Sequence, residues 1–217
     1  MLRPLLRGCV ASALALSSAA CGADSQFLTD YAGDPYMGRV RAIVYDGSDN
    51  RLMTRRGEGS AVFEPTGGNR ARLVVTGVID GASGTAGDAS FAIDGTYGRD
   101  GWTAQAGEVE MRIADDGRIE GGGASGGNRY AFSGRARPGR MLLTVELTPL
   151  DAGKAQVASR FKFDYTLSRE APEGARDMSS GAQGEGGRCR SIRYEMRPVA
   201  SIGDGTMSML RVPVCLK

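Results

Sequence analysis

The chain contains no histidine. It therefore cannot form a Ser-His-Asp or Cys-His catalytic site on its own, nor the usual histidine-based zinc and iron sites. It also has no phosphate-binding loop of the form G-x-x-x-x-G-K-[ST]. We accordingly expect no metal and no cofactor.

Carboxylate pairs are the main catalytic route that this composition leaves open. Glu108 and Glu110 share one face of an expected strand, and Asp115 and Asp116 lie together at an expected turn, so both pairs have a spacing that paired acids can use. Alternation of the glutamates with apolar residues is, however, typical of a solvated sheet face. A histidine-free envelope hydrolase that uses carboxylates is therefore the alternative to a non-catalytic function.

Long hydrophobic runs are also missing. The N-terminus has only a short apolar segment, in which Arg3 and Arg7 precede a charge-free run from Gly8 to Ala23. A helix that spans a membrane needs about 20 apolar residues. A basic start, a short apolar centre and a small-residue exit instead predict a cleaved signal peptide over residues 1–20.

The exit of this segment, Ser18-Ala19-Ala20-Cys21, resembles the lipobox of bacterial lipoproteins, although Ser18 stands where leucine is most common. The resemblance implies that Cys21 is acylated, becomes the new N-terminus and anchors the protein to a membrane. Gly22 follows in place of the aspartate that retains such proteins at the inner membrane. In a Gram-negative cell the protein would then reside in the outer membrane, facing the periplasm or the cell surface. Ordinary cleavage after Ala20 or Ala23 is the alternative.

The cysteine count fits an exported protein. Of the four cysteines, Cys9 leaves with the signal peptide, and acylation of Cys21 leaves Cys189 and Cys215 as an even pair. In an oxidising compartment such a pair favours a disulfide. The two cysteines lie symmetrically about residues 202–205, so the sequence predicts a C-terminal hairpin with Cys189 opposite Cys215.

The charge balance does not favour nucleic acid as a partner. The chain has 27 basic and 25 acidic side chains, and removal of residues 1–20 takes away Arg3 and Arg7, which leaves 25 of each. Binding to many phosphates needs a concentrated positive surface. We therefore expect no nucleic-acid partner.

The dominant pattern of the remaining chain is short apolar alternation with a period of two. In residues 140–148 and 160–167 apolar side chains occupy every second position, which is typical of strands with one buried and one wet face. Six Asp-Gly pairs lie among the expected strands and are typical of tight turns. The sequence predicts an all-β antiparallel meander, closed into a barrel that is lipocalin-like in shape only, or arranged as a two-layer sandwich.

The predicted organisation after the signal peptide is an N-terminal tether over 21–36 and a β domain over 37–169. A glycine-, serine- and charge-rich flexible linker over 170–187 and a disulfide-linked hairpin over 188–217, packed on the β domain, complete it. We expect a non-catalytic binding or assembly module that holds a small apolar ligand or engages another envelope protein. The candidate contact residues are Trp102, Tyr97, Arg188, Arg190, Arg193 and Arg197.

Overall fold

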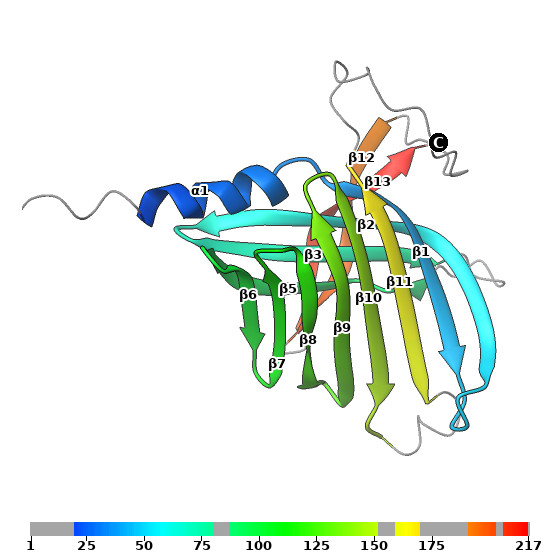
Figure 1. Cartoon of the computed structure of the whole chain (residues 1–217). Helices are drawn as coiled ribbons and strands as arrows, with labels where there is room; N and C mark the ends of the chain where they lie inside the picture. Colours follow the sequence, from blue (N-terminus) through cyan, green and yellow to red (C-terminus); the bar gives the residue numbers. More distant parts are fainter. Residues whose placement is uncertain (1–19, 80–86, 152–158, 170–190, 203–205, 217) are drawn as a thin grey trace, which may run out of the picture.

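The computed structural model describes residues 20–79, 87–151, 159–169, 191–202 and 206–216. These residues form an all-β antiparallel structure with one helix, as the sequence predicts (Figure 1). The elements are α1 (Ala20–Tyr31), β1 (Tyr36–Tyr45), β2 (Arg51–Gly67), β3 (Arg70–Ile79), β4 (Gly87–Asp88), β5 (Phe91–Gly98), β6 (Gly101–Ala106), β7 (Val109–Ala114), β8 (Arg118–Ser125), β9 (Asn128–Arg137), β10 (Arg140–Pro149), β11 (Arg160–Ser168), β12 (Ser191–Ser201) and β13 (Met207–Leu216).

Ten of these strands close into an up-and-down barrel. From β5 to β11 each strand pairs with the next, β11 returns to pair with β1, and β1, β2, β3 and β5 complete the ring. Closure is continuous at both joints, with Val40 opposite Tyr165 between β1 and β11, and Leu73 opposite Ile93 between β3 and β5. Closure removes free sheet edges. The predicted barrel is thus confirmed.

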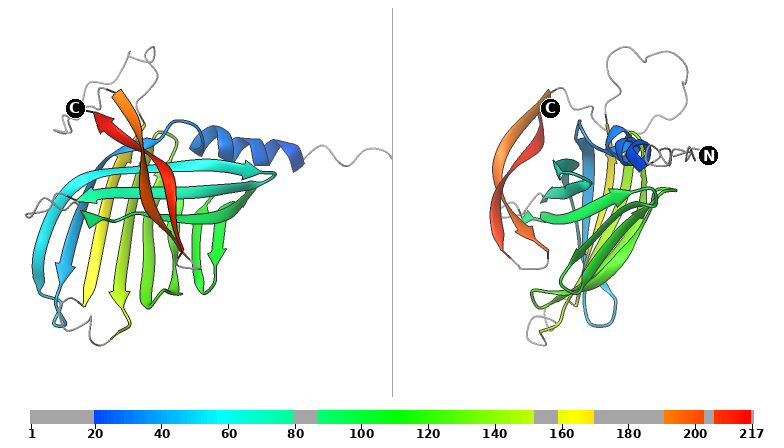
Figure 2. Two further views of the ribbon diagram at one scale, coloured as in Figure 1. Left: turned by 180° about the vertical axis from the view of Figure 1, so that it is seen from behind. Right: turned by 90° about the vertical axis from the view of Figure 1, so that its left-hand side faces the viewer.

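The barrel is flattened into two layers that cross. In Figure 1, β1 and β6 to β11 run from top to bottom in one layer, whereas β3 and β5 run across behind them. The long strand β2 bends from the first layer into the second, and Figure 2 shows the crossing layer from behind. A Cβ atom at Gly57 of β2 would lie 1.9 Å from the carbonyl oxygen of Val78, so only glycine fits where these strands approach.

The two ends of the barrel are distinguished by the helix and the turns that they carry. The "helix end" carries α1 and the turns at residues 68–69, 99–100, 115–117 and 138–139. The "far end" carries the turns at residues 46–50, 107–108 and 126–127. Because the strands alternate in direction, each turn falls at the end opposite to the one before it.

Helix α1 occupies most of the segment 21–36, for which the sequence predicts only a tether. Phe27 and Tyr31, from its C-terminal half, are buried in the barrel core. The Arg169 guanidinium donates to the carbonyl oxygens of Asp30 and Tyr31 at the helix C-terminus and stacks 4.3 Å from the centroid of the Tyr36 ring. A cation at this position satisfies carbonyl groups that have no partner within the helix.

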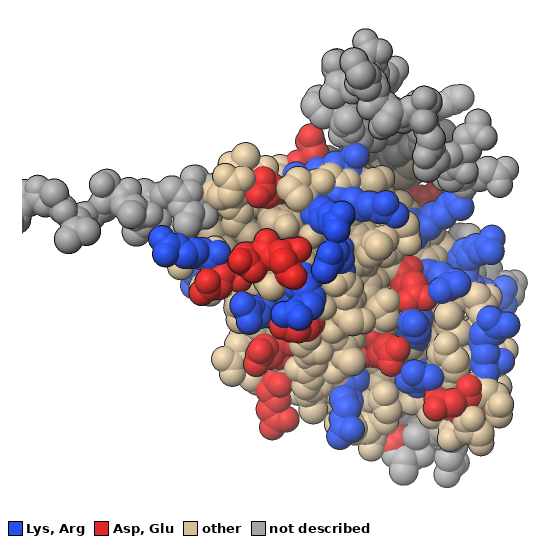
Figure 3. Space-filling view, viewed as in Figure 1, with Lys and Arg blue, Asp and Glu red and all other residues tan. Residues whose placement is uncertain are grey.

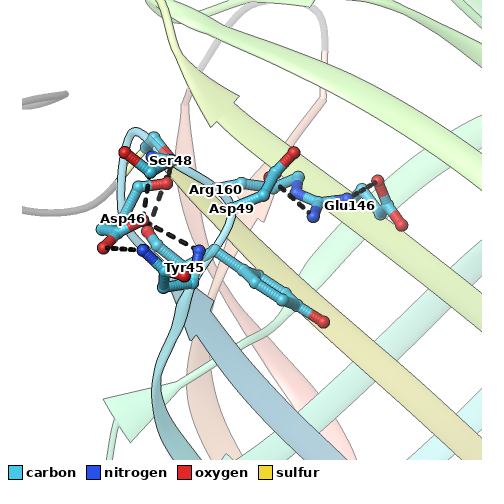
Figure 4. Close-up of polar contacts among 8 residues, drawn as sticks. Tyr45, Asp46, Ser48, Asp49, Glu146 and Arg160 are labelled. Carbon is cyan, nitrogen blue, oxygen red and sulfur yellow. Dashed lines mark hydrogen bonds and ion pairs between the residues drawn. The ribbon is translucent and has the colours of Figure 1, made fainter.

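A set of ion pairs on the outer surface supports the joint between β1 and β11 (Figure 4). Arg160 pairs with Asp49 at 2.9 Å and with Glu146 at 3.3 Å, and its guanidinium lies 4.3 Å from the centroid of the Tyr45 ring. In the adjoining turn, Asp46 accepts hydrogen bonds from the backbone N–H groups of residues 48 and 50. The first and last strands of the barrel are therefore joined by side chains as well as by backbone pairing.

The C-terminal hairpin of β12 and β13 packs on the outside of the crossing layer (Figure 2). Val199 and Val212 of the hairpin are buried against Val74 and Ala92, on the outward face of β3 and β5. A short parallel pairing of Ala200 with Phe91 attaches β12 to β5. The hairpin thus forms a third layer that covers part of the barrel wall.

The pairing register of this hairpin differs from the predicted one. Ile192, and not Cys189, lies opposite Cys215, so the symmetric register was wrong by three residues. Cys189 and the predicted linker over 170–187 lie outside the described residues. A bond between Cys189 and Cys215 therefore stays a prediction.

Candidate ligand-binding site at the far end

The inward-facing residues of five neighbouring strands form rows across the barrel wall. At the far end, one residue from each of β9, β10, β11, β1 and β2 pairs with the next across the wall. These five residues constitute the "rim row". Four of its members are half-buried, and Met53 is 42% exposed, although all five side chains are apolar or aromatic. The rim row consists of Tyr130, Leu147, Phe161, Val44 and Met53.

The next row inward, the "second row", is more deeply buried. Phe132, Val145 and Ala42 are 3%, 5% and 8% exposed, whereas Phe163 and Arg55 are half-buried. These five residues pair across the same strands as the rim row. The described residues therefore form an apolar inward surface that is partly open to solvent at the rim row and more deeply buried at the second row.

Tyr165 lies one row further in and forms the floor of this surface. A Cβ atom at Gly59 or Gly77, in the crossing layer, would lie 3.1 Å from the Tyr165 side chain, so the tyrosine reaches from one layer to the other. Its hydroxyl donates a hydrogen bond of 2.8 Å to the Ala89 carbonyl. Burial raises the pKa of Tyr165, which keeps the hydroxyl neutral and able to donate.

The aromatic residues of β9 face a strand with little side-chain bulk. Phe132 and Tyr130 lie opposite Gly121 and Gly123 of β8, and the two rings are stacked with centroids 6.2 Å apart. Burial raises the pKa of Tyr130, and a hydrogen bond with Asn128 partly offsets this. The phenol is therefore a neutral polar group on an otherwise apolar wall.

Among the described residues, the start of β2 forms an edge beside this surface. Within these residues Arg51 to Arg56 pair with β1 only, and β3 pairs with β2 from Gly57 onward. A depression of about 310 Å³ at this edge is lined by Arg51, Leu52, Met53 and Thr54. The far end is thus accessible along β2 as well as through the rim row.

Trp102 and Tyr97, which the sequence analysis named as candidate ligand contacts, lie in the packed core at the opposite end. Trp102 has no exposed surface and its indole N–H donates to the Ala71 carbonyl at 3.0 Å. Tyr97 is 4% exposed, and its hydroxyl donates to the Gly68 carbonyl at 2.8 Å. Both residues therefore have a packing role in this structure.

The aromatic packing around these residues includes helix α1. Phe27 stacks on Tyr97 with centroids 5.3 Å apart and meets Phe63 edge-on at 5.3 Å. Phe63 in turn contacts Trp102 at 5.6 Å. These rings close the helix end, whereas the rim row at the far end keeps part of its surface exposed.

The candidate arginines of the hairpin are partly neutralised. Arg193 and Arg197 both pair with Glu195, and these two hydrogen bonds lower the pKa of the glutamate. Arg188 and Arg190 lie outside the described residues. A groove of about 180 Å³ between hairpin and barrel is lined in part by Arg197 and Cys215.

The outward face of the hairpin is apolar. Its exposed side chains include Ile192, Tyr194, Met196, Met207 and Met209, with exposures between 40% and 64%. The Arg211 guanidinium lies 4.8 Å from the centroid of the Tyr194 ring. This face belongs to a layer outside the barrel and does not join the far-end surface.

The carboxylates considered for catalysis are distributed over solvated surfaces. Glu108 and Glu110 are exposed, and Asp115 and Asp116 accept hydrogen bonds from backbone N–H groups of their own turn. Within the described residues, no cluster of three or more histidine, cysteine, aspartate or glutamate side chains could hold a metal ion. Acidic and basic side chains are interspersed on the outer face of the front layer (Figure 3).

Comparison with known proteins does not assign the chain. Neither the protein-family models nor the curated proteins searched contain a match. No helix within the described residues is long and apolar enough to cross a membrane. Cys21 lies near the start of α1, but its side chain is outside the described residues.

Proposed function

We propose that this protein is a non-catalytic, lipid-anchored module of the cell envelope that holds a small apolar ligand at the far end of its barrel. One observation carries the proposal: the rim row is apolar and aromatic, faces inward, and yet is only half-buried. Small-molecule sites are typically concave and apolar with few polar groups. An apolar ligand in contact with this row would remove its remaining surface from water.

The position of α1 supports an arrangement in which the binding end points away from the membrane. Acylation of Cys21 would put the anchor near the start of α1, and this helix docks at the helix end. The far end, with its rim row, then lies at the opposite end of the barrel from the anchor. A ligand could enter and leave without displacing the helix.

The geometry favours ligand binding over the two other functions considered. A hydrolase using carboxylates would need acids gathered at an accessible site, whereas Glu108, Glu110, Asp115 and Asp116 lie on outer surfaces and turns. Engagement of another envelope protein would use the outer apolar face of the hairpin, which is separate from the rim row and does not explain why the rim row is left half-buried. The apolar ligand is therefore the function that we carry forward.

A neutral apolar fluorophore should bind to the rim row. Addition of N-phenyl-1-naphthylamine to the mature protein should give saturable, blue-shifted fluorescence. The substitution Leu147→Ser should weaken its binding about tenfold, because a leucine contact is replaced by a hydroxyl. A fluorescence titration of both proteins measures the change.

Leu142→Ser is the matched control for this experiment. Leu142 lies on the same strand but faces outward and is 39% exposed. Its substitution should leave the fluorophore affinity unchanged. Equal weakening by both substitutions, or the absence of saturable binding to the unmodified protein, would contradict the proposal.

The intact mass of the protein recovered from an expressing bacterium tests the anchor and the disulfide together. We expect a chain that begins at Cys21 and carries the added mass of acyl groups. Alkylation before reduction should not label Cys189 and Cys215, and alkylation after reduction should label both. An unprocessed, unacylated chain with two freely alkylated C-terminal thiols would contradict both predictions.

A further inference from the structure

Arg55 is a cation on the inward face of the barrel wall. Backbone pairing between β1 and β2 is regular from Ala42–Arg55 to Gly38–Gly59, so residues 55, 57 and 59 share one face. This face is the inner one, because a Cβ atom at Gly59 would contact the buried side chains of Tyr165 and Leu167. The backbone of Arg55 therefore lies one row deeper than Met53.

The paired neighbours of Arg55 in the second row are all apolar. Ala42, Phe163, Val145 and Phe132 complete the row, and none of them can accept a side-chain hydrogen bond. Within the part of the chain that the structure describes, Arg55 has neither an ion pair nor a side-chain hydrogen bond. Two other partly buried arginines, Arg160 and Arg169, both have several partners.

An arginine that is half-buried beside apolar side chains packs its aliphatic stem against them and keeps its guanidinium accessible, where it can meet an anion. The planar guanidinium offers paired donors that match a carboxylate or phosphate group. The surrounding rim and second rows offer contacts for an apolar chain. A molecule with an anionic head group and an apolar chain would satisfy both the guanidinium and the apolar rows.

We propose that the ligand is a single-chain anionic amphiphile, with its apolar chain against the rim and second rows and its anionic head group on Arg55. This inference rests on the proposed function, because it specifies the chemistry of the ligand at the same site. It adds one element that an apolar surface alone does not require, namely a preference for a negative head group.

Displacement of N-phenyl-1-naphthylamine by matched twelve-carbon competitors tests this preference. Dodecanoate, dodecyl phosphate and dodecanol have equal chain lengths, and all are used below their micelle concentrations at pH 8. At least one of the two anions should displace the fluorophore at a concentration about tenfold lower than dodecanol does, because a charge-assisted hydrogen bond is added. The order of the two anions distinguishes a carboxylate from a phosphate head group.

The substitutions R55Q and R56Q separate the site from general electrostatics. Arg56 is the next residue of β2, is exposed, and faces outward. R55Q should reduce the affinity for the preferred anion to that for dodecanol, while R56Q, which removes the same charge, should preserve the preference. R55K, which keeps the charge and loses the paired donors, should retain only part of it.

The possible failures are distinguishable. If the fluorophore does not bind, or if Leu147→Ser has no effect, the proposed function itself is wrong. If the fluorophore binds but the three competitors act equally, or if R55Q and R56Q act equally, the ligand is apolar without a head-group preference and this inference is wrong. If R55Q does not fold by circular dichroism, the competitor ratio of the unmodified protein and of R55K decides.

Discussion

Replacement of Trp102 by alanine should lower the free energy of unfolding by about 4 kcal/mol, which is a large share of the stability of a domain of this size. The indole ring is completely buried, contacts Phe63 edge-on with centroids 5.6 Å apart, and donates its N–H to the Ala71 carbonyl. Truncation would leave a cavity in the wall and a carbonyl without its donor. Urea unfolding followed by circular dichroism measures the loss.

Trp102→Phe is the control that separates the ring from the N–H group. It retains most of the apolar contact and should cost less than the alanine substitution, mainly through the lost hydrogen bond. Gly95→Ala tests the same contact from the other side, because its Cβ atom would lie 2.5 Å from the indole ring. A loss below about 1 kcal/mol for Trp102→Ala would show that the ring is not part of the core.

Most of the fold could be predicted from alternating hydrophobicity. The segments 140–148 and 160–167 correspond closely to β10 and β11, because a strand with one buried face must repeat every two residues. The strands β6 and β8 were not predicted. β6 has only six residues, and β8 contains three consecutive glycines that carry no side-chain pattern.

Some turn signals were misleading for a physical reason. Asp46, Asp100 and Asp116 lie at turns, as Asp-Gly pairs predict, but Asp94 lies within β5. Gly95 is needed there because the Trp102 ring occupies the space of a side chain. A glycine selected for close packing and one selected for a turn look the same in a single sequence.

The candidate site was largely missed by sequence reasoning. The segment from Arg51 to Arg56 is polar and shows no clean alternation, so Arg55 had no signal that distinguished it from Arg56. Only the pairing of β2 with β1 assigns the two arginines to opposite faces. Conversely, the single tryptophan attracted a functional interpretation, whereas its neighbours place it in the core.

The helix was missed because its apolar pattern is weak and its packing is long-range. Phe27 and Tyr31 are four residues apart and lie on one face, but the rings that they contact come from β2 and β5. A helix of this length is marginal in isolation. We infer that tertiary contact at its C-terminal half, together with the Arg169 cap, stabilises it.

Replacement of Phe27 by alanine should therefore detach α1 from the barrel and lower the free energy of unfolding by about 3 kcal/mol. Phe27 is 5% exposed and contacts Tyr31, Phe63 and Tyr97. Backbone amides over 26–32 should exchange with deuterium much faster in the variant, while those of β10 remain protected. Hydrogen exchange with mass spectrometry distinguishes this local release from global unfolding.

Gln26→Ala is the matched control for this helix, because Gln26 is exposed and, within the described residues, its side chain hydrogen-bonds to Asp30 of the same helix. It should leave exchange over α1 nearly unchanged. If Phe27→Ala also leaves it unchanged, the aromatic contacts do not hold the helix. Release of α1 would turn a docked helix into a longer connection between Cys21 and the barrel. If Cys21 is acylated as we propose, the contacts of Phe27 would therefore determine how closely the barrel is held to the membrane.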